Sequence, residues 1–325
     1  MAVTANTNET YNTTTIREDL SEALTSISPT EVPFMTAVGS KNVSNTYFEW
    51  PVVSLAAAAS NVVAEGESAP GNDAPNNAVR LGNYCQLSDK VVEVSTTADS
   101  VTGAGGNVQS LAKQVALKLK ELKRDMELAC TGLNNAAVAG SSGTARETAS
   151  LSAFLRTNVD RGATATAPTL SGTTAGYPNA APGDGTDRAL TELMLNDVIA
   201  DCWTAGAEPS IILCGAGVKQ KISKTFTGTS TRYQEMDSSK TITSAVDIYV
   251  SDFGTLQVVP SRFTRTRDLY IIDPSMARIC YLQKAKQTPL ARTGHAERRL
   301  IAVEFGLQVD TELAHGVVAD IDPAL

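Results

Sequence analysis

The sequence has 325 residues, enough to bury a substantial core in two domains or in one domain with large excursions. Its formal net charge of −8 argues against a dedicated nucleic-acid-binding domain, because such domains carry a strongly basic surface. Charged residues make up only 19% of the chain, less than the usual quarter of a globular protein. This low charge fraction suits a chain that hides surface against copies of itself.

The five cysteines are widely spaced and lie in apolar contexts. This pattern predicts reduced core residues and not a disulfide framework. The sequence shows no apolar signal segment at its start, and no apolar run approaches the ~18 residues of a membrane span. We therefore expect folding in the cytoplasm and no membrane partner.

The chain is expected to begin with an N-terminal arm. Residues 1–15 are rich in Asn and Thr and have little to bury, so a partner would have to order them. Residues 16–27 predict a short helix, and Thr30 could cap the segment that follows, up to Gly39. The apolar side of the helix comprises Ile16, Leu20, Ala23, Leu24 and Ile27. A second apolar patch comprises Phe34, Met35 and Val38.

Residues 46–95 predict a strand, a loop and a second strand that together form an extended two-stranded ribbon. Tyr47–Trp50 begins the ribbon, and Tyr84–Val94 returns with β-forming side chains. Two arms of about eighteen residues would reach on the order of 50 Å. An isolated ribbon is marginal in water, so we expect this one to lie on an identical neighbour.

A long amphipathic helix is predicted over Asn107–Cys130, with Asn107 as its N-cap and a length of roughly 36 Å. Its apolar stripe comprises Val108, Leu111, Ala112, Val115, Leu119, Leu122, Met126 and Cys130. Leu117 and Leu128 project almost opposite this stripe, among charged residues that include Glu127. Either they are ordinary exposed leucines or a neighbouring subunit covers them.

Residues 161–186 are rich in Gly, Ala, Thr and Pro and predict a surface flap or a domain boundary. An α/β unit follows. It comprises a helix over Asp187–Ala205, a strand over Ser210–Cys214, a helix over Val218–Phe226, and two antiparallel strands on either side of Asp252–Gly254. The inward side of the first helix is predicted to comprise Leu190, Leu193, Met194, Val198 and Cys202.

The C-terminal part returns to strands. Leu269–Ile272 predicts a strand that ends at the turn Asp273–Ser275. Residues 301–309 alternate strictly between apolar and polar side chains, which predicts a half-buried strand. We expect these late strands to be the platform for the long helix.

The best enzyme-like signal is Cys214–Lys219, where a Gly-rich turn joins a strand to a helix. A dinucleotide-binding motif would need glycine at Gln220, and a phosphate-binding loop would need Gly-Lys-Ser/Thr, so the pattern favours a structural turn. His295 and His315 are expected to be loop or sheet-edge residues, and no metal-ligand spacing is present. We expect no catalytic residue, no cofactor and no metal, and no raised carboxyl pKa values.

Charged clusters have structural interpretations as well. The arginines at positions 262, 265 and 267, and at 292, 298 and 299, are expected to be ion-pair partners or solvated more often than phosphate contacts. The carboxylate pairs Glu65/Glu67 and Asp184/Asp187 lie in Gly-rich loops, where solvation or intersubunit pairing is expected.

The order of these parts resembles the major capsid protein of tailed bacteriophages, an α+β fold typified by phage Hong Kong 97. Several local stretches of the sequence are similar to one family of such proteins. The matching stretches are REDLSEALTSISPTEVPFMTAVG (17–39), NTYFEW (45–50), RLGNYCQLSDKVVEVS (80–95), LKLKELKRDME (117–127) and LYIIDPS (269–275). They are spread over nearly the whole chain.

This resemblance implies an N-terminal arm (1–44), an extended loop (45–95), a peripheral domain with a spine helix (96–185), an axial domain (186–260) and returning peripheral strands (261–325). It implies hexamers and pentamers that close an icosahedral shell around double-stranded DNA, which would contact the inner surface weakly. The subunit would reside in the virion, and in the host cytoplasm during assembly. Candidates for intersubunit contact are Glu65, Glu67, Arg80, Leu117 and Leu128.

Two departures from the family matter. Some relatives cross-link the subunits of their shells through an isopeptide bond from a lysine in the extended loop, but residues 51–89 contain no lysine. Relatives can also carry a long N-terminal scaffolding segment, so we expect a separate scaffold protein or prior cleavage, together with a portal protein. Two alternatives stay open: a cytosolic enzyme that holds a phosphate or nucleotide at Ile211–Lys219, and an encapsulin-like compartment shell.

Overall fold

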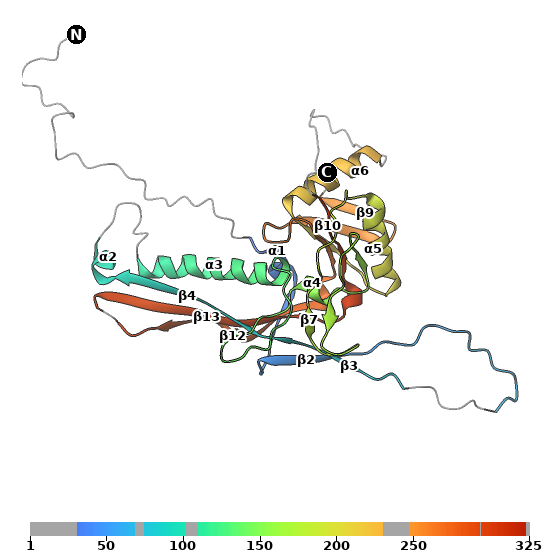
Figure 1. Ribbon diagram of the computed structural model, residues 1–325, viewed down its shortest axis with the longest axis horizontal. Helices are drawn as coiled ribbons and strands as arrows, with labels where there is room; N and C mark the ends of the chain where they lie inside the picture. Colours follow the sequence, from blue (N-terminus) through green and yellow to red (C-terminus); the bar gives the residue numbers. More distant parts are fainter. Residues whose placement is uncertain (1–30, 69–74, 102–109, 230–246, 293, 323–325) are drawn as a thin grey trace, which may run out of the picture.

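A computed structural model describes residues 31–68, 75–101, 110–229, 247–292 and 294–322. The predicted helix at 16–27, the possible cap Thr30 and the predicted N-cap Asn107 lie outside these ranges. The body is built on two sheets (Figure 1). No helix within the described ranges is long and apolar enough to cross a membrane.

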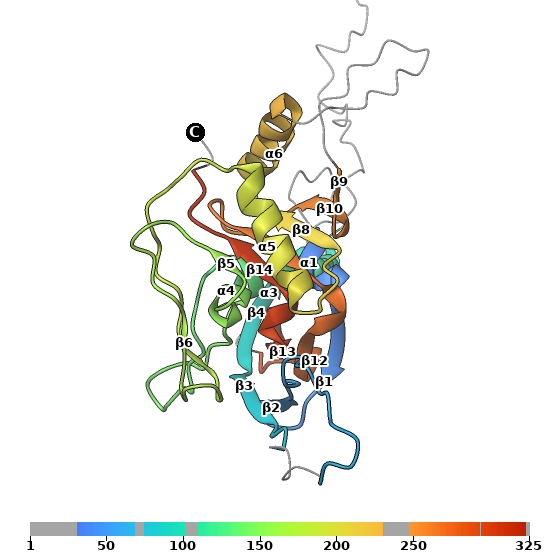
Figure 2. The same ribbon diagram turned by 90° about the vertical axis from the view of Figure 1, so that its right-hand side faces the viewer.

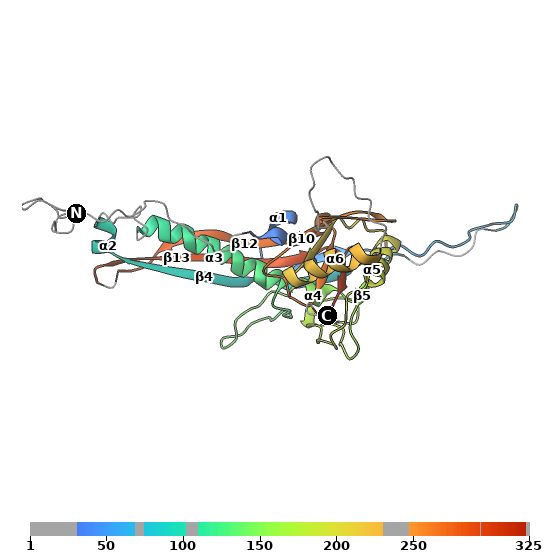
Figure 3. The same cartoon turned by 90° about the horizontal axis from the view of Figure 1, so that it is seen from above.

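A long helix lies along a four-stranded sheet (Figures 1 and 3). The strand order is β1 (Gly39–Asn42), β12 (Ala277–Pro289), β13 (Ala296–Val309) and β4 (Gln86–Ser95). The helix is α3 (Leu111–Thr131), whose N-cap is Ser110, and α2 (Thr96–Ser100) follows β4. The predicted platform is confirmed for β13, where Ile301, Val303 and Phe305 are buried at alternate positions. The half-buried pattern predicted over 301–309 is wrong beyond Phe305, because Gly306 and Gln308 are buried too.

The apolar stripe of α3 is confirmed only in part. Val115, Leu122, Met126 and Cys130 are buried, whereas Leu111 and Leu119 are half-buried. Ala112 is exposed, which contradicts its place in the stripe, and Val108 lies outside the described residues. The C-terminal half of the helix is buried more completely because α1 (Pro33–Ala37) and α4 (Leu151–Phe154) pack on it beside the sheet.

The six-stranded sheet has the order β5 (Val159–Asp160), β14 (Gly316–Val318), β11 (Leu269–Ile272), β8 (Ile211–Cys214), β10 (Gly254–Pro260) and β9 (Ile248–Ser251). Two helices, α5 (Glu192–Thr204) and α6 (Ala216–Thr229), lie by one face of it (Figure 2). The strand-turn-strand pairing of β9 and β10 is confirmed. Short 3₁₀ turns occur at Pro274–Met276 and Glu312–Ala314.

Two predictions about this second sheet are wrong. β11 was expected beside the long helix, but it pairs with β8 and β14, and β14 pairs with β5. The predicted boundary at residue 260 therefore does not separate the two sheets. Helix α5 begins at Glu192, and Leu193 is 68% exposed. Thr191 caps the helix, so Leu190 is buried ahead of it in a non-helical stretch.

Two small sheets complete the fold. β2 (Tyr47–Val52) pairs with β3 (Val79–Tyr84), and β6 (Thr169–Leu170) pairs with β7 (Pro178–Ala180). The predicted return arm Tyr84–Val94 is therefore wrong over most of its length, because Gln86–Ser95 pairs with β13 in the body. Pairing in the ribbon covers six residues per arm, far fewer than the eighteen expected.

Candidate functional site

The segment between β2 and β3, here called the extension (residues 53–78), does not pack on the rest of the subunit in its described part. Every described residue in it is exposed, and it runs away from the body (Figure 1). Its large apolar side chains are also exposed: Val53 at 54%, Leu55 at 84%, Val62 at 90% and Val63 at 55%. Apolar side chains gathered on a protruding segment are typical of a surface that another chain covers.

The root of the extension is packed firmly onto the body. Phe48 and Trp50 of β2 are buried, and the Trp50 ring lies 6.1 Å from that of Phe154 on α4. On the other side, the rings of Tyr47 and Tyr84 lie 4.8 Å apart, and Tyr177 packs against both. The body therefore fixes where the extension begins and in which direction it leaves.

A fully buried amide, Asn83, ties this root to the main sheet. Its Nδ2 donates to Leu307 O at 2.7 Å and to Thr148 Oγ1 at 3.0 Å. Its Oδ1 accepts from the backbone nitrogens of Tyr84 and Ala149. One side chain thus joins β3, β13 and the loop before α4. Asn83 entered the sequence-based predictions only within the stretch 80–95 that resembles the family, and that did not reveal this role.

The predicted contact residues of the ribbon lie in two places. Glu65 and Glu67 come together in an exposed turn, where Glu67 Oε2 accepts from Ala64 N at 3.1 Å. Arg80 lies at the root, where its side chain is 73% exposed and pairs with Glu49 at 3.2 Å. These residues are accessible on the single subunit, as a contact with a neighbour requires.

The two leucines of the outer helix face differ in their surroundings. Leu128 is half-buried, and its side chain lies next to Gly132 beside the backbone of Phe263 in the same chain. Leu117 is also half-buried, and the residue after it, Lys118, pairs with Glu121. The chain therefore covers part of this face itself near Leu128.

Sequence reasoning missed Glu127, which was placed on the charged outer face of the helix. It is fully buried, and its two carboxylate oxygens accept from Phe34 N at 2.8 Å and from Met35 N at 2.9 Å. Burial raises the pKa of this carboxyl, and the two backbone hydrogen bonds oppose that shift only in part. Its one signal in the sequence is its position next to Met126, at the edge of the apolar stripe.

Replacing Glu127 with Gln should change how stability depends on pH. A carboxyl whose pKa is raised in the folded state binds more protons there than in the unfolded chain, so stability falls as the pH rises from its ordinary value of 4.5 through the raised value. Gln cannot ionise. We expect the variant to gain stability relative to the wild type as the pH is raised from 4 to 7, measured by urea unfolding.

Thr131→Val is a matched control, because Thr131 is equally buried one turn further along α3 but does not ionise. Its difference from the wild type should stay constant over the same pH range. A Gln variant that loses stability relative to the wild type as the pH rises would contradict the raised pKa.

The predicted role of the basic clusters as ion-pair partners is confirmed for five arginines. Arg265 pairs with Asp184 and Asp268, and Arg267 pairs with Asp184, Asp187 and Asp320. Arg298 pairs with Glu93, and Arg292 and Arg299 pair with Glu297. Asp184 and Asp187, expected to be solvated or to pair between subunits, are thus paired within the chain.

Other chemical candidates also have structural roles. Lys219 donates to Asp247 Oδ1 and to Val258 O, both at 3.1 Å, so its amino group joins α6 to the sheet. His315 lies in the loop just before β14, as expected, and it is fully buried, which lowers its pKa. Burial also raises the pKa of Asp268, contrary to expectation. Among the described residues, no three His, Cys, Asp or Glu side chains are grouped to hold a metal ion.

Comparison with known proteins now identifies the chain. The family model of the SU10 major capsid protein matches residues 3–322. The chain belongs to this family. The major capsid protein of Escherichia phage Phieco32 is 24% identical in an alignment 324 residues long, which covers 90% of this chain and 90% of that protein. The subunit is therefore a phage major capsid protein, a structural component of the virion.

Solved structures show the same fold. The cyanophage A-1(L) capsid aligns with a TM-score of 0.65 and 12% identity over 94% of this chain and 97% of that one. The SrpI encapsulin complex of Synechococcus elongatus PCC 7942 aligns with a TM-score of 0.58 and 12% identity over 95% and 93%. The Hong Kong 97-type fold is thus confirmed. The family match favours a capsid over an encapsulin-like compartment, which shares the fold.

Proposed function

We propose that this capsid protein assembles as hexamers and pentamers into an icosahedral phage head, and that the extension is the main link between subunits. The observation that carries this proposal is the complete exposure of residues 53–68 and 75–78, with apolar side chains that the subunit itself leaves in water. Many copies of such a contact, each of modest area, stabilise a closed symmetric assembly.

In this assembly, α3 and the four-stranded sheet would form the peripheral domain, and the six-stranded sheet would form the axial domain. The axial domain would then include β11 and β14, which extends it beyond the boundary predicted at residue 260. Glu65, Glu67 and Arg80 would contact the adjacent subunit. We propose no catalytic activity for the chain itself.

The interior would hold double-stranded DNA. The net charge of −8 works against binding a polyanion, so weak contact is expected. A separate scaffold protein and a portal protein would assist assembly, which would take place in the host cytoplasm.

Electron microscopy of the purified recombinant chain tests this proposal. Closed particles of uniform diameter are the expected result, and particles that hold genome and not a cargo enzyme would separate a phage head from a compartment. A strictly monomeric, compact protein whose extension folds back on its own body would overturn the proposal. Thermal stabilisation by nucleotides would instead favour the enzyme alternative.

Replacing Leu117 with Glu tests whether a neighbour covers the outer face of α3. The side chain is half-buried, so a new charge should change the unfolding free energy by only about 1 kcal/mol while reducing shell formation. Particle yield and urea unfolding measure the two effects. Leu128→Glu, beside Phe263 of the same chain, should harm folding more; equal losses of folding and assembly at Leu117 would indicate ordinary packing.

A further inference from the structure

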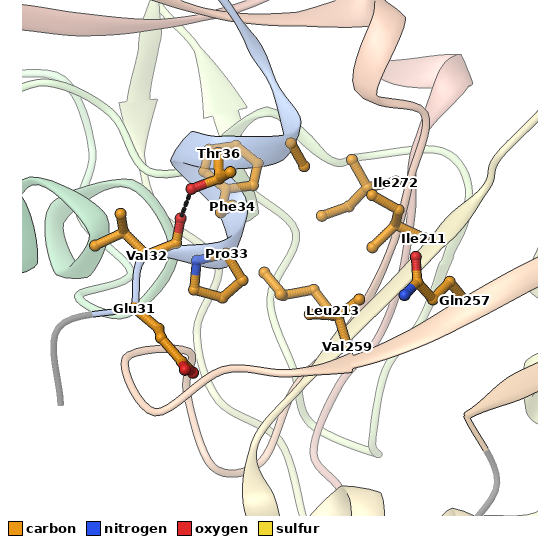
Figure 4. A pocket seen from close by; sticks show the side chains of 11 residues that line it. Glu31, Val32, Pro33, Phe34, Thr36, Ile211, Leu213, Gln257, Val259 and Ile272 are labelled. Carbon is orange, nitrogen blue, oxygen red and sulfur yellow. Dashed lines mark hydrogen bonds between the residues drawn. The ribbon is translucent and has the colours of Figure 1, made fainter.

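An apolar groove of about 390 Å³ lies between α1 and the six-stranded sheet (Figure 4). Its sheet side consists of Leu213, Val259 and Ile272, from three neighbouring strands, and its helix side includes Pro33 and Phe34. Glu31, Thr36 and Gln257 are the polar residues among those that line it. The other lining side chains are apolar, as expected of a surface that binds another apolar surface.

The open surface continues beyond the groove to the edge of the sheet. Ile272, Ile211, Gln257 and Ile248 are register partners in turn across β11, β8, β10 and β9, so their side chains share one face. Exposure rises along this row, from 2% at Ile272 to 62% at Ile248. Val250, on the same face of β9, is 73% exposed.

The opposite face of these strands is filled. Leu256 and Val258 of β10 are 1% and 3% exposed, and they belong to the core that α5 and α6 cover. Within the described residues, strands β10 and β9 therefore have helices on one face only. The apolar side chains on their other face are exposed, which is typical of a surface that a further apolar element covers.

We propose that residues 16–27 of the same chain dock as an amphipathic helix on this open face, named here the arm-docking face (Ile211, Leu213, Gln257, Val259, Ile248 and Val250). These residues precede the described part of the chain. Their apolar positions, Ile16, Leu20, Ala23, Leu24 and Ile27, share one side of a helix. Ser28 and Pro29 end that helix and allow the chain to turn.

The position of Glu31, where the described chain begins, supports residues 16–27 as the segment that docks on this face. Glu31 itself lines the groove, so whatever precedes it starts at the mouth of the groove. Residues 28–31 can span at most ~13 Å, which keeps the end of the proposed helix close to the arm-docking face. Helix pairs joined by two to about five residues are common in proteins, so a link of this length is sterically ordinary.

The sizes match as well. A helix of twelve residues is ~18 Å long and about 10 Å wide. Strands β8, β10 and β9 lie ~4.8 Å apart, so with their side chains they present a face of comparable length across the strands. One such helix can therefore cover Ile248 and Val250 together with the groove.

The short link also favours the chain's own segment over that of a neighbour. A segment tethered by a few residues experiences an effective concentration in the millimolar range, whereas a neighbour must first meet the subunit. The proposed docking thus belongs to the free subunit and goes beyond the role of the extension in the shell.

Disulfide trapping in the purified, unassembled full chain tests the proposal. Leu20→Cys or Leu24→Cys is combined with Ile248→Cys or Val250→Cys, and the four double variants are oxidised and run on non-reducing gels. All five native cysteines are buried and burial raises their thiol pKa, so they should react slowly. A faster-migrating monomer from at least one double variant is the expected result.

Leu24→Cys with Lys123→Cys is the matched control, because Lys123 is exposed on α3, outside the arm-docking face. It should give no fast-migrating product. Covalent dimers as the main product would show that a neighbour's segment docks there, and would overturn docking within one chain. No disulfide from any of the four pairs would overturn the proposal altogether.

Hydrogen exchange supplies a second reading. Leu24→Asp should speed the exchange of amides in β9 and β10 by about tenfold, because it removes the cover from an edge strand. Thr25→Asp places the same charge almost opposite the apolar side of the proposed helix and should leave that exchange unchanged. Unaltered exchange in Leu24→Asp would count against the proposal. Both experiments precede assembly, so their failure is distinguishable from a failure to form shells.

Discussion

A subunit that lacks residues 59–78 is expected to fold normally and to form no closed shells. The described residues of this segment are all exposed, so their removal exposes no core. β2 and β3 stay paired, now across the six residues 53–58. Shortening the loop should even stabilise the subunit by about 1 kcal/mol through the smaller entropy cost of closing it. Size-exclusion chromatography, electron microscopy and urea unfolding measure these outcomes.

A variant in which a Gly/Ser linker of equal length replaces residues 59–78 is the matched control. It keeps the length of the extension but removes its apolar and acidic side chains, including Val62, Val63 and both glutamates. If both variants form no shells, these side chains make the contact. If the linker variant forms shells again, only the length of the extension matters. Normal particles from the deletion variant would refute the extension as the link between subunits.

Sequence periodicity was sufficient where one element has one buried face. The alternation at Ile301, Val303 and Phe305 predicts which face of β13 meets the helix, and the structure buries these side chains. The stripe of α3 is right at Val115, Leu122 and Met126 for the same reason. Each residue lies on a surface with a single apolar partner, so the period alone carries the information.

Periodicity failed where both faces are buried. All four residues of β11 are buried, so the run has no polar side to show which sheet it joins. The result was an incorrect neighbour for β11. The prediction for Glu127 was wrong for a related reason. Its charge placed the carboxylate in solvent, whereas hydrogen bonds from Phe34 N and Met35 N, in a segment far away in the sequence, make its burial possible.

The candidate contact residues were predictable as accessible positions but not as a geometry. Arg80 and Glu67 are exposed, as expected of contact residues, yet the residues that aim the extension were not identified. Asn83 and the three tyrosines at its root act through contacts with loops far away in the sequence. No local pattern encodes such contacts.

Replacing Asn83 with Leu should have the largest effect of any single change at this root. The substitution keeps the volume but removes both amide donors and the acceptor, which leaves Leu307 O and Ala149 N buried without a partner. Each unsatisfied buried group costs about 1–3 kcal/mol, so we expect a loss of roughly 3 kcal/mol in the free energy of unfolding. Urea unfolding of the unassembled subunit measures it.

Asn77→Leu is the control, because Asn77 is exposed in the extension and should change the unfolding free energy by less than about 0.5 kcal/mol. Thr148→Val removes the hydroxyl that Asn83 contacts. Since the two side chains share one hydrogen-bond network, the double variant should be less destabilised than the sum of the single variants. Additive losses would mean that Asn83 acts by packing alone.

Because Asn83 holds the root while residues 53–78 make the contact, its loss should reduce both stability and shell formation, whereas the deletion of residues 59–78 abolishes shells only.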